Sequence, residues 1–316
     1  MLDHACAIAR SVLRLLARRV ARPALAVGDL KRSGYEVRFA LEGGLRVLMP
    51  RVGYGGLLTS KGRLLASQCG SFASRPGKEA LLRKTVYEWF RDGQIDPARS
   101  VVDIGSWLAD NAIVWAKMLQ PGAVVYAIDP SPSNISFGKA LAELNGVDNI
   151  RWFREVCSDT PGKVLSFQGS IDHASFSSAP SGSKRGRRAL LSTTLDQVVE
   201  RECHDCISLM HVDVEGFEAE VLQGARGILA ASRPVVIFEQ HIAAEDARPI
   251  LELFRDLRYD VYMINEALPG CELDCRNFVA WPAERELPPM PALVHHEGRE
   301  LGIWYAALGE PLIRVA

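Results

Sequence analysis

The stretch that decides the fold runs from residue 207 to residue 241 and reads ISLMHVDVEGFEAEVLQGARGILAASRPVVIFEQH. Residues 207–212 form a short and mainly apolar run, which is typical of a strand buried on both faces. Residues 217–230 then repeat apolar side chains at helical spacing, and residues 234–239 return to an apolar, β-branched run. A strand, a helix and a second strand in this order predict a βαβ unit with parallel strands.

The same alternation extends outward from this stretch in both directions. It predicts further strands at 100–104, 123–128, 149–156, 259–264 and 277–281, and helices at 79–92, 108–119, 133–144 and 244–257. The sequence therefore predicts an α/β fold, with a mostly parallel sheet covered by helices on both faces. Two segments fall outside this rhythm, residues 1–75 and residues 286–316, so we expect an N-terminal extension, a core domain over 76–285 and a C-terminal tail.

Residues 157–200 interrupt the alternation. Residues 170–188 within them are rich in Ser, Gly, Lys and Arg, and we expect a mobile loop over the sheet. Loops of this length in compact domains often cover a functional site. The basic run at 184–188 would suit an anionic acceptor, although solvated charge is the alternative.

The charge balance restricts the partners. The chain of 316 residues carries 37 Lys and Arg against 38 Asp and Glu, a formal net charge of −1. Non-specific binding to nucleic acid requires an excess of basic over acidic residues, so we expect no nucleic-acid partner. The chain has no run of 18 apolar residues that would span a bilayer. Residues 2–20 predict a helix with an arginine stripe, for which contact with an anionic membrane surface is possible, but docking on the rest of the protein is favoured.

The seven cysteines indicate a reducing compartment, because secreted disulfide frameworks usually show an even and denser set. We therefore expect a cytoplasmic protein. The two cysteine pairs, Cys203 with Cys206 and Cys271 with Cys275, have a spacing that zinc would accept. Buried or surface thiols are the favoured interpretation, and we expect no metal among the site residues.

Polar residues follow the first three predicted strands of the core, where open α/β sheets bind ligands. Asp103 and Gly105, with the adjacent Ser106, come at the end of strand 100–104, and a glycine there lets the backbone approach a ligand. Asp129 ends the second strand, where an acidic residue typically accepts hydrogen bonds from ribose hydroxyls; capping of the next helix is the alternative. These residues predict an adenosyl pocket. After the third strand come two residues that would meet an adenine amino group or else form a turn, Ser158 and Asp159.

A second set follows the strands of the deciding stretch. Asp213 and Glu215 come directly after strand 207–212, above the sheet where a substrate would lie, although Glu215 at a helix start would also be a favourable charge. His241 leaves strand 234–239 among acidic neighbours, as a candidate base or a surface residue. A hydroxyl acceptor benefits from a general base, and Asp213, Glu215 and His241 are the candidates.

The block TTLDQVV at 193–199, together with residues 207–241, resembles the FkbM-type S-adenosyl-L-methionine-dependent methyltransferases. The shared pattern is T-L-D, then D-x-E-G-x-E, then V-L-x-G-A, then a proline-led strand that ends in Glu. Asp129, the S-D-x-x-G turn at Ser158 and the late strand RNFVAWP also fit. The resemblance implies a Rossmann-like class I methyltransferase fold with seven strands, the seventh antiparallel. It also implies methyl transfer from S-adenosyl-L-methionine to an oxygen of a sugar, glycolipid or other natural product.

The first turn departs from the family pattern D-x-G-A-N-x-G. Trp107 stands where a small residue or Asn is expected, and Ala109 replaces the second glycine. Asn tolerates the left-handed backbone region better than Trp does, so either the turn is remodelled, or Trp107 packs against cofactor or substrate, or the cofactor site is weakened. Two rival functions stay open: a non-catalytic binding or scaffold protein, and an NAD-dependent oxidoreductase, which would want a fuller G-x-G-x-x-G turn.

Overall fold

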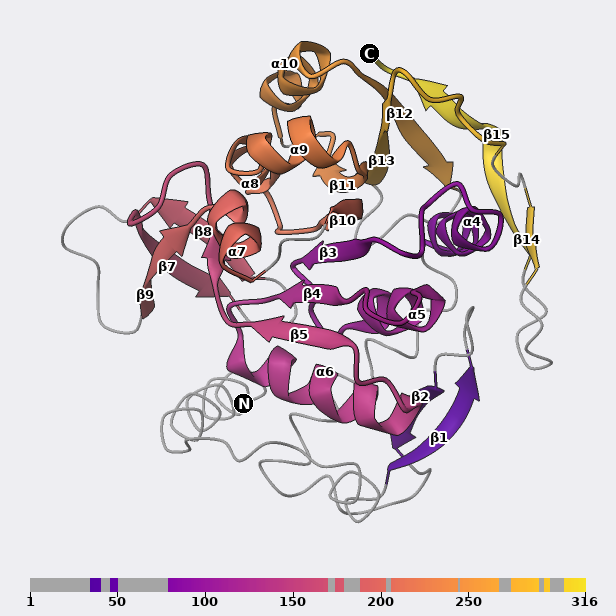
Figure 1. Ribbon diagram of the computed structural model, residues 1–316, viewed down its shortest axis with the longest axis vertical. Coiled ribbons are helices and arrows are strands. Elements are labelled where there is room, and N and C mark those ends of the chain that lie inside the picture. The colour runs from indigo at the N-terminus through magenta and orange to yellow at the C-terminus, as the bar shows by residue number, and fades with distance from the viewer. Residues whose placement is uncertain are drawn as a thin grey trace, which may run out of the picture.

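The computed structural model describes residues 35–40, 46–50, 79–169, 174–178, 188–202, 206–243, 245–266, 274–289, 293–295 and 304–316. Its main sheet contains nine strands: β3 (Ser100–Ile104), β4 (Val125–Ile128), β5 (Ile150–Phe153), β10 (Ile207–Val212), β11 (Val235–His241), β12 (Tyr259–Glu266), β13 (Cys275–Pro282), β14 (Leu293–His295) and β15 (Trp304–Arg314). They lie in the order β14-β15-β12-β13-β11-β10-β3-β4-β5 (Figure 1).

The central strands β5, β4, β3, β10 and β11 are parallel, and β13 is inserted antiparallel between β11 and β12. The predicted α/β fold with a seventh, antiparallel strand is confirmed, and its fold class is the Rossmann-like class I methyltransferase fold. The expected count of seven strands is too low, because β15 pairs antiparallel with β12 and β14 pairs with β15. Both added strands come from residues 286–316, where the sequence led us to expect only a tail.

Helices cover both faces of this sheet, and each face has its own apolar core. On one face lie α4 (Ala80–Arg91), α5 (Asp110–Met118) and α6 (Pro132–Asn145). On the other face lie α7 (Leu195–Glu202), α8 (Glu218–Gln223), α9 (Arg226–Ser232) and α10 (Arg248–Asp256). Figure 1 shows these two layers on either side of the strands. Strand side chains alternate between the layers, which explains why the central strands are apolar along their whole length.

One predicted helix is divided in two. The pattern predicts a single helix over 217–230, whereas the structure has α8 and α9 with a break at Gly224. At the break, the backbone of Gly224 lies directly against that of Ser158. A Cβ added at Gly224 would lie only 2.0 Å from the Ser158 carbonyl oxygen. The Asp196 carboxylate accepts hydrogen bonds from the backbone N–H groups of Gly227 and Ile228 at the start of α9.

The interruption at 157–200 contains a second, small sheet rather than a loop alone. Its strands are β6 (Val156–Cys157), β7 (Val164–Gly169), β8 (Ala174–Ser178) and β9 (Arg188–Thr193), in the order β6-β9-β7-β8. The prediction of a loop over 170–188 is therefore wrong over the residues of β8, which pairs antiparallel with β7. Residues 170–173 and 179–187 lie outside the described residues. Serine-rich strands lack the apolar alternation by which a strand is recognised.

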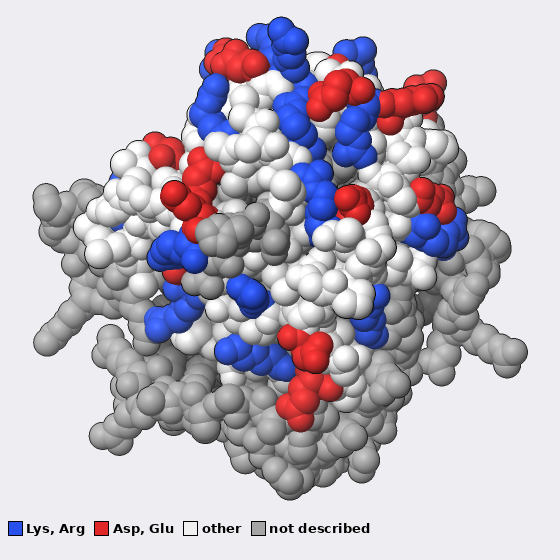
Figure 2. Space-filling model, in the orientation of Figure 1, with Lys and Arg blue, Asp and Glu red and all other residues white. Residues whose placement is uncertain are grey.

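At the N-terminus, β1 (Tyr35–Ala40) and β2 (Arg46–Pro50) form an antiparallel pair. The arginine-striped helix expected over 2–20 lies outside the described residues, and the domain limits stay predictions. Among the described residues, no helix combines the length and apolar character needed to cross a bilayer. On the face drawn in Figure 2, basic and acidic side chains of the described residues are interspersed rather than gathered by sign.

Candidate active site

The first turn, between β3 and α5, keeps a left-handed backbone despite its unusual residues. Trp107 has a φ of 45° and Ala109 a φ of 62°. The turn is therefore not remodelled to suit Trp and Ala, and each such residue costs roughly 1–2 kcal/mol of backbone strain. The side chain of Trp107 is half-buried and packs against the core of the α4–α6 face.

Gly105 in this turn is required by the protein's own backbone. Its φ is 76°, and a Cβ would lie 1.6 Å from the carbonyl oxygen of Asp213. It lets the turn after β3 contact the end of β10, which brings the two sets of candidate residues to one edge of the sheet. The role of Gly105 in the approach of a ligand stays a prediction.

Asp129, at the end of β4, is buried and holds two turns together. Its Oδ1 accepts a hydrogen bond from the Ser131 N–H at 2.7 Å, and its Oδ2 accepts from the Trp107 N–H and the Asn134 amide, both at 3.1 Å. Burial raises the pKa of Asp129 to about 7, and these three hydrogen bonds oppose the rise. The helix cap itself is Ser131, whose side chain accepts from the Asn134 N–H.

The remaining residues predicted for the cofactor differ in exposure. Ser106 and Ser158 are buried, whereas Asp159 is exposed. The Ser158 hydroxyl donates to Asp159 Oδ1 at 2.7 Å. Lys163 lies beside Asp159, and its hydrogen bond lowers the pKa of that carboxyl. This geometry fits the turn interpretation of Ser158 and Asp159, and their contact with adenine stays a prediction.

Asp103 has a partner that the sequence did not reveal. Its Oδ1 lies 2.7 Å from Nδ1 of His211, and both side chains are buried. The two residues are register partners on β3 and β10. Burial by itself lowers the pKa of His211, but the hydrogen bond and charge of Asp103, with the charges of Asp213 and Glu79, raise it overall. A single histidine in an apolar strand leaves no signal in the pattern, and only its register with β3 reveals the pair.

The predicted catalytic residues come together at the carboxyl ends of β10 and β11. Carboxylate oxygens of Asp213, Glu215 and Glu239 lie within 4.8 Å of one another. His241 Nε2 lies 3.7 Å from Glu215 Oε2, and its Nδ1 lies 3.4 Å from Asp274 Oδ1. Burial raises the pKa of Asp213 to about 6; the charge of His211 opposes this rise and that of Glu215 adds to it. Asp213, Glu215 and His241 thus share one cluster, to which the structure adds Glu239.

Glu218, the last acid of the D-x-E-G-x-E pattern, shapes the turn that carries Glu215. Its carboxyl group is buried and accepts hydrogen bonds from the N–H groups of Val214 and Gly216, at 3.0–3.2 Å. Burial raises the pKa of Glu218 to about 8, against the effect of the hydrogen bond from Val214. This glutamate therefore positions the turn from inside the protein.

The two described cysteines of the possible zinc pairs lie far apart. Cys206 directly precedes β10, whereas Cys275 is the register partner of His241 at the other end of the parallel strand β11. One ion cannot bind both, so a site formed by the two pairs together is wrong. Cys203 and Cys271 lie outside the described residues.

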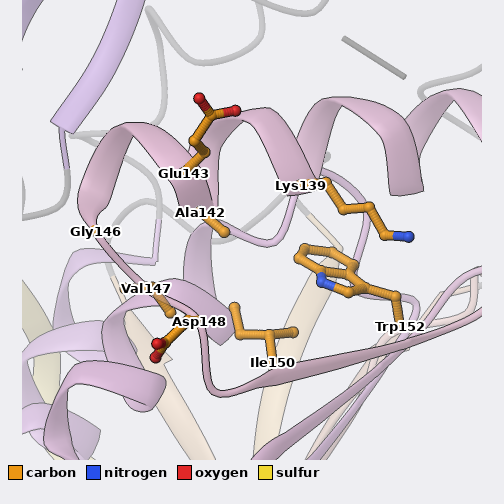
Figure 3. A pocket seen from close by; sticks show the side chains of 8 residues that line it. All are labelled: Lys139, Ala142, Glu143, Gly146, Val147, Asp148, Ile150 and Trp152. Carbon is orange, nitrogen blue, oxygen red and sulfur yellow. The ribbon is translucent and has the colours of Figure 1, made fainter. Parts of the chain in front are cut away.

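A pocket of about 440 Å³ lies away from these residues (Figure 3). It opens between α6 and the start of β5. It is lined by Lys139, Ala142, Glu143, Gly146, Val147, Asp148, Ile150 and Trp152. The loop before β5 belongs to the amino end of the sheet, so this pocket is not part of the candidate site.

Several solved structures match the chain at low similarity. A methyltransferase FkbM from Methylobacillus flagellatus KT is 13% identical with a TM-score of 0.40, and the match covers 61% of this chain and 46% of that one, less than half its length. A SAM-dependent methyltransferase from Aquifex aeolicus is 12% identical with a TM-score of 0.36, over 65% and 92% of the two chains. Trm5b from Pyrococcus abyssi is 14% identical with a TM-score of 0.39, over 78% and 55%.

No curated protein matches the chain. The family model of the methyltransferase FkbM domain matches residues 101–261, which is about half of the chain and runs from β3 to the start of β12. This span includes the first turn, Asp129 and the cluster at Asp213. The chain therefore belongs to the FkbM methyltransferase family.

Proposed function

We propose that the protein transfers a methyl group from S-adenosyl-L-methionine to a hydroxyl oxygen of a small-molecule or glycan acceptor, such as a sugar, a glycolipid or another natural product. Membership of the FkbM methyltransferase family supports the transfer. The observation that carries the acceptor side is the meeting of Asp213, Glu215 and His241 at the carboxyl ends of two central strands. Open α/β sheets bind their ligands at this edge.

The residues after β3 and β4 fit a bound adenosyl group. An ionised carboxylate offers about four acceptor positions, and Asp129 uses three of them within the protein. One position is left for a ribose hydroxyl. Ser106, in the adjacent turn, is the second residue that we assign to the cofactor, together with Asp103 and Gly105 of the same strand end and turn. When bound, the cofactor supplies a methyl group activated by its sulfonium sulfur.

On the acceptor side, the chain's own residues have to orient a hydroxyl and receive its proton. In-line transfer needs the hydroxyl oxygen within about 3–3.5 Å of the methyl carbon. We assign the proton to Asp213, and the contact between its backbone carbonyl and the turn at Gly105 supports this assignment. Glu215 and His241, 3.7 Å apart, are then available to bind and orient the acceptor.

Calorimetry with S-adenosylhomocysteine and NAD, side by side, tests the cofactor. We expect binding of S-adenosylhomocysteine alone, and Asp129→Ala to weaken it at least tenfold, because a hydrogen bond to a charged acceptor contributes about 1.5–3 kcal/mol. Binding of NAD instead would indicate the oxidoreductase. Binding of neither would indicate a non-catalytic scaffold.

A screen of sugars and glycolipids with a labelled methyl donor then tests the transfer. We expect Asp213→Asn to lower turnover by roughly 10²–10⁴, the usual contribution of a positioned base, with much of the cofactor affinity retained. Asp256→Asn is the matched control, since that carboxylate is exposed on α10. If Asp213→Asn is fully active while His241→Ala is inactive, the proton acceptor belongs to β11.

The cysteines and the net charge bear on where the proposed reaction takes place and with which partners. Among the described residues, Cys157, Cys206 and Cys275 form no disulfide, which supports a reducing, cytoplasmic location. The near-neutral net charge supports the absence of a nucleic-acid partner. Contact of residues 2–20 with an anionic membrane surface is less favoured than docking, and vesicle co-sedimentation at two salt concentrations tests it.

A further inference from the structure

Three different metal-binding side chains meet where β11 and β13 pair. Glu239 and His241 lie two residues apart on β11, and Cys275 is the register partner of His241 on β13. One donor atom from each lies within 4.8 Å of the other two. Glu239 and Cys275 are buried, and the Cys275 thiol donates a hydrogen bond to Glu239 Oε1. The donor atoms of three side chains from two strands thus lie close together.

The imidazole of His241 is held in the way that metal-binding histidines usually are. Such histidines have a carboxylate or carbonyl on the nitrogen that does not bind the metal. Asp274 Oδ1 lies 3.4 Å from Nδ1 of His241, and Glu215 Oε2 lies 3.7 Å from Nε2, so we assign Nε2 as the ligand atom and Nδ1 to Asp274. This carboxylate is not one of the three donors and belongs to Asp274, the residue directly before Cys275.

The charges around Glu239 favour a cation. Glu239 also belongs to a second group, in which its oxygen lies within 4.8 Å of oxygens of Asp213 and Glu215. Three carboxyl groups at this spacing repel one another unless they bind protons or a positive ion. A bound divalent ion is often the largest local charge in a site and removes this repulsion.

We propose that Glu239, His241 and Cys275 bind one divalent transition-metal ion of the zinc class, with Asp213 and Glu215 near its open position. A thiolate, an imidazole and a carboxylate are together the donors that zinc and cobalt accept, whereas magnesium and calcium require oxygen ligands alone. Three protein ligands with a fourth position left open are typical of zinc sites that also bind water or substrate. This proposal does not depend on methyl transfer.

The test uses the full-length protein after dialysis against a chelator. We expect calorimetry with Zn²⁺ to show one ion per chain, and added Zn²⁺ to raise the unfolding temperature, because an ion that binds only the folded state stabilises it. Co²⁺ should give the near-ultraviolet charge-transfer absorption of a thiolate ligand. Cys275→Ser should abolish that absorption and weaken Zn²⁺ binding by at least about 100-fold.

A second variant and two controls separate the ligands from the fold. His241→Gln changes a half-buried residue at a strand end, and it should weaken Zn²⁺ binding similarly while retaining the thiolate absorption. Cys206→Ser and Cys157→Ser change free thiols outside the cluster and should leave both measurements as in the wild type. The proposal is overturned if the wild type binds no Zn²⁺, if Cys275→Ser and His241→Gln bind it as the wild type does, or if Cys206→Ser loses it.

Discussion

Replacing Gly105 with alanine tests how the turn after β3 is joined to the end of β10. The added Cβ would lie 1.6 Å from the carbonyl oxygen of Asp213, and a contact below 3.0 Å forces a shift. The two backbones would therefore have to separate by more than about 1 Å. In addition, Gly105 has a φ of 76°, where an alanine is strained.

Two other glycines allow the steric clash and the backbone strain to be measured separately. Gly93 has a φ of 73°, and a Cβ added there would have nothing within 4 Å, so Gly93→Ala carries the strain alone, about 1–2 kcal/mol. Gly224 has a φ of −74°, but its Cβ would lie 2.0 Å from the Ser158 carbonyl oxygen, so Gly224→Ala carries the clash alone, roughly 1–3 kcal/mol. Gly105→Ala carries both, and we expect a loss of about 2–5 kcal/mol.

Urea unfolding of the wild type and the three variants measures these free energies, provided that the slope with urea is unchanged. Because the clash acts on Asp213, Gly105→Ala should also lower the proposed methyl transfer by about 10²-fold, as a misplacement of 1 Å commonly does. Gly224→Ala should not. If Gly105→Ala costs no more than Gly93→Ala, the contact with Asp213 is not as close as the structure shows, and the reasoning is refuted.

Three further predictions concern buried or capping groups. Burial raises the pKa of Glu218 to about 8 from an ordinary value of 4.5, so its contribution to stability is full below pH 4.5 and is lost as the pH rises through 8. Glu218→Gln should remove roughly 3–5 kcal/mol of this pH dependence of the unfolding free energy, measured from pH 5 to 9. An unchanged dependence on pH would contradict the prediction. Asp196→Ala should cost about 0.5–2 kcal/mol in thermal unfolding, because its carboxylate receives two N–H groups at the start of α9, whereas Asp196→Asn should cost less. His211→Ala leaves Asp103 buried without its partner and should cost several kcal/mol in the same assay, more than the exposed control Glu252→Ala.

Sequence periodicity was sufficient for the order and type of the central elements. Strands 100–104 and 207–212 coincide with β3 and β10 to the residue, and helices 79–92, 108–119 and 133–144 agree with α4, α5 and α6 within two residues. The helix predicted over 217–230 is divided into α8 and α9, and α7 was not predicted. The hydrophobic pattern carries this information because it records which side chains of a segment are buried, and burial repeats with the period of the helix or strand. The same pattern placed Asp129, Asp213 and His241 at strand ends, which is why these candidates lie at one edge of the sheet.

Which side chains touch one another was decided only by the tertiary structure. His211 meets Asp103 across 108 residues of sequence, and Cys275 meets Glu239 across 36, because strands that are distant along the chain pair in one register. Gly105 is likewise explained only by the carbonyl of Asp213. Periodicity within a segment determines which face a residue occupies, but its neighbours on that face depend on strand order and register, which arise from packing the whole sheet.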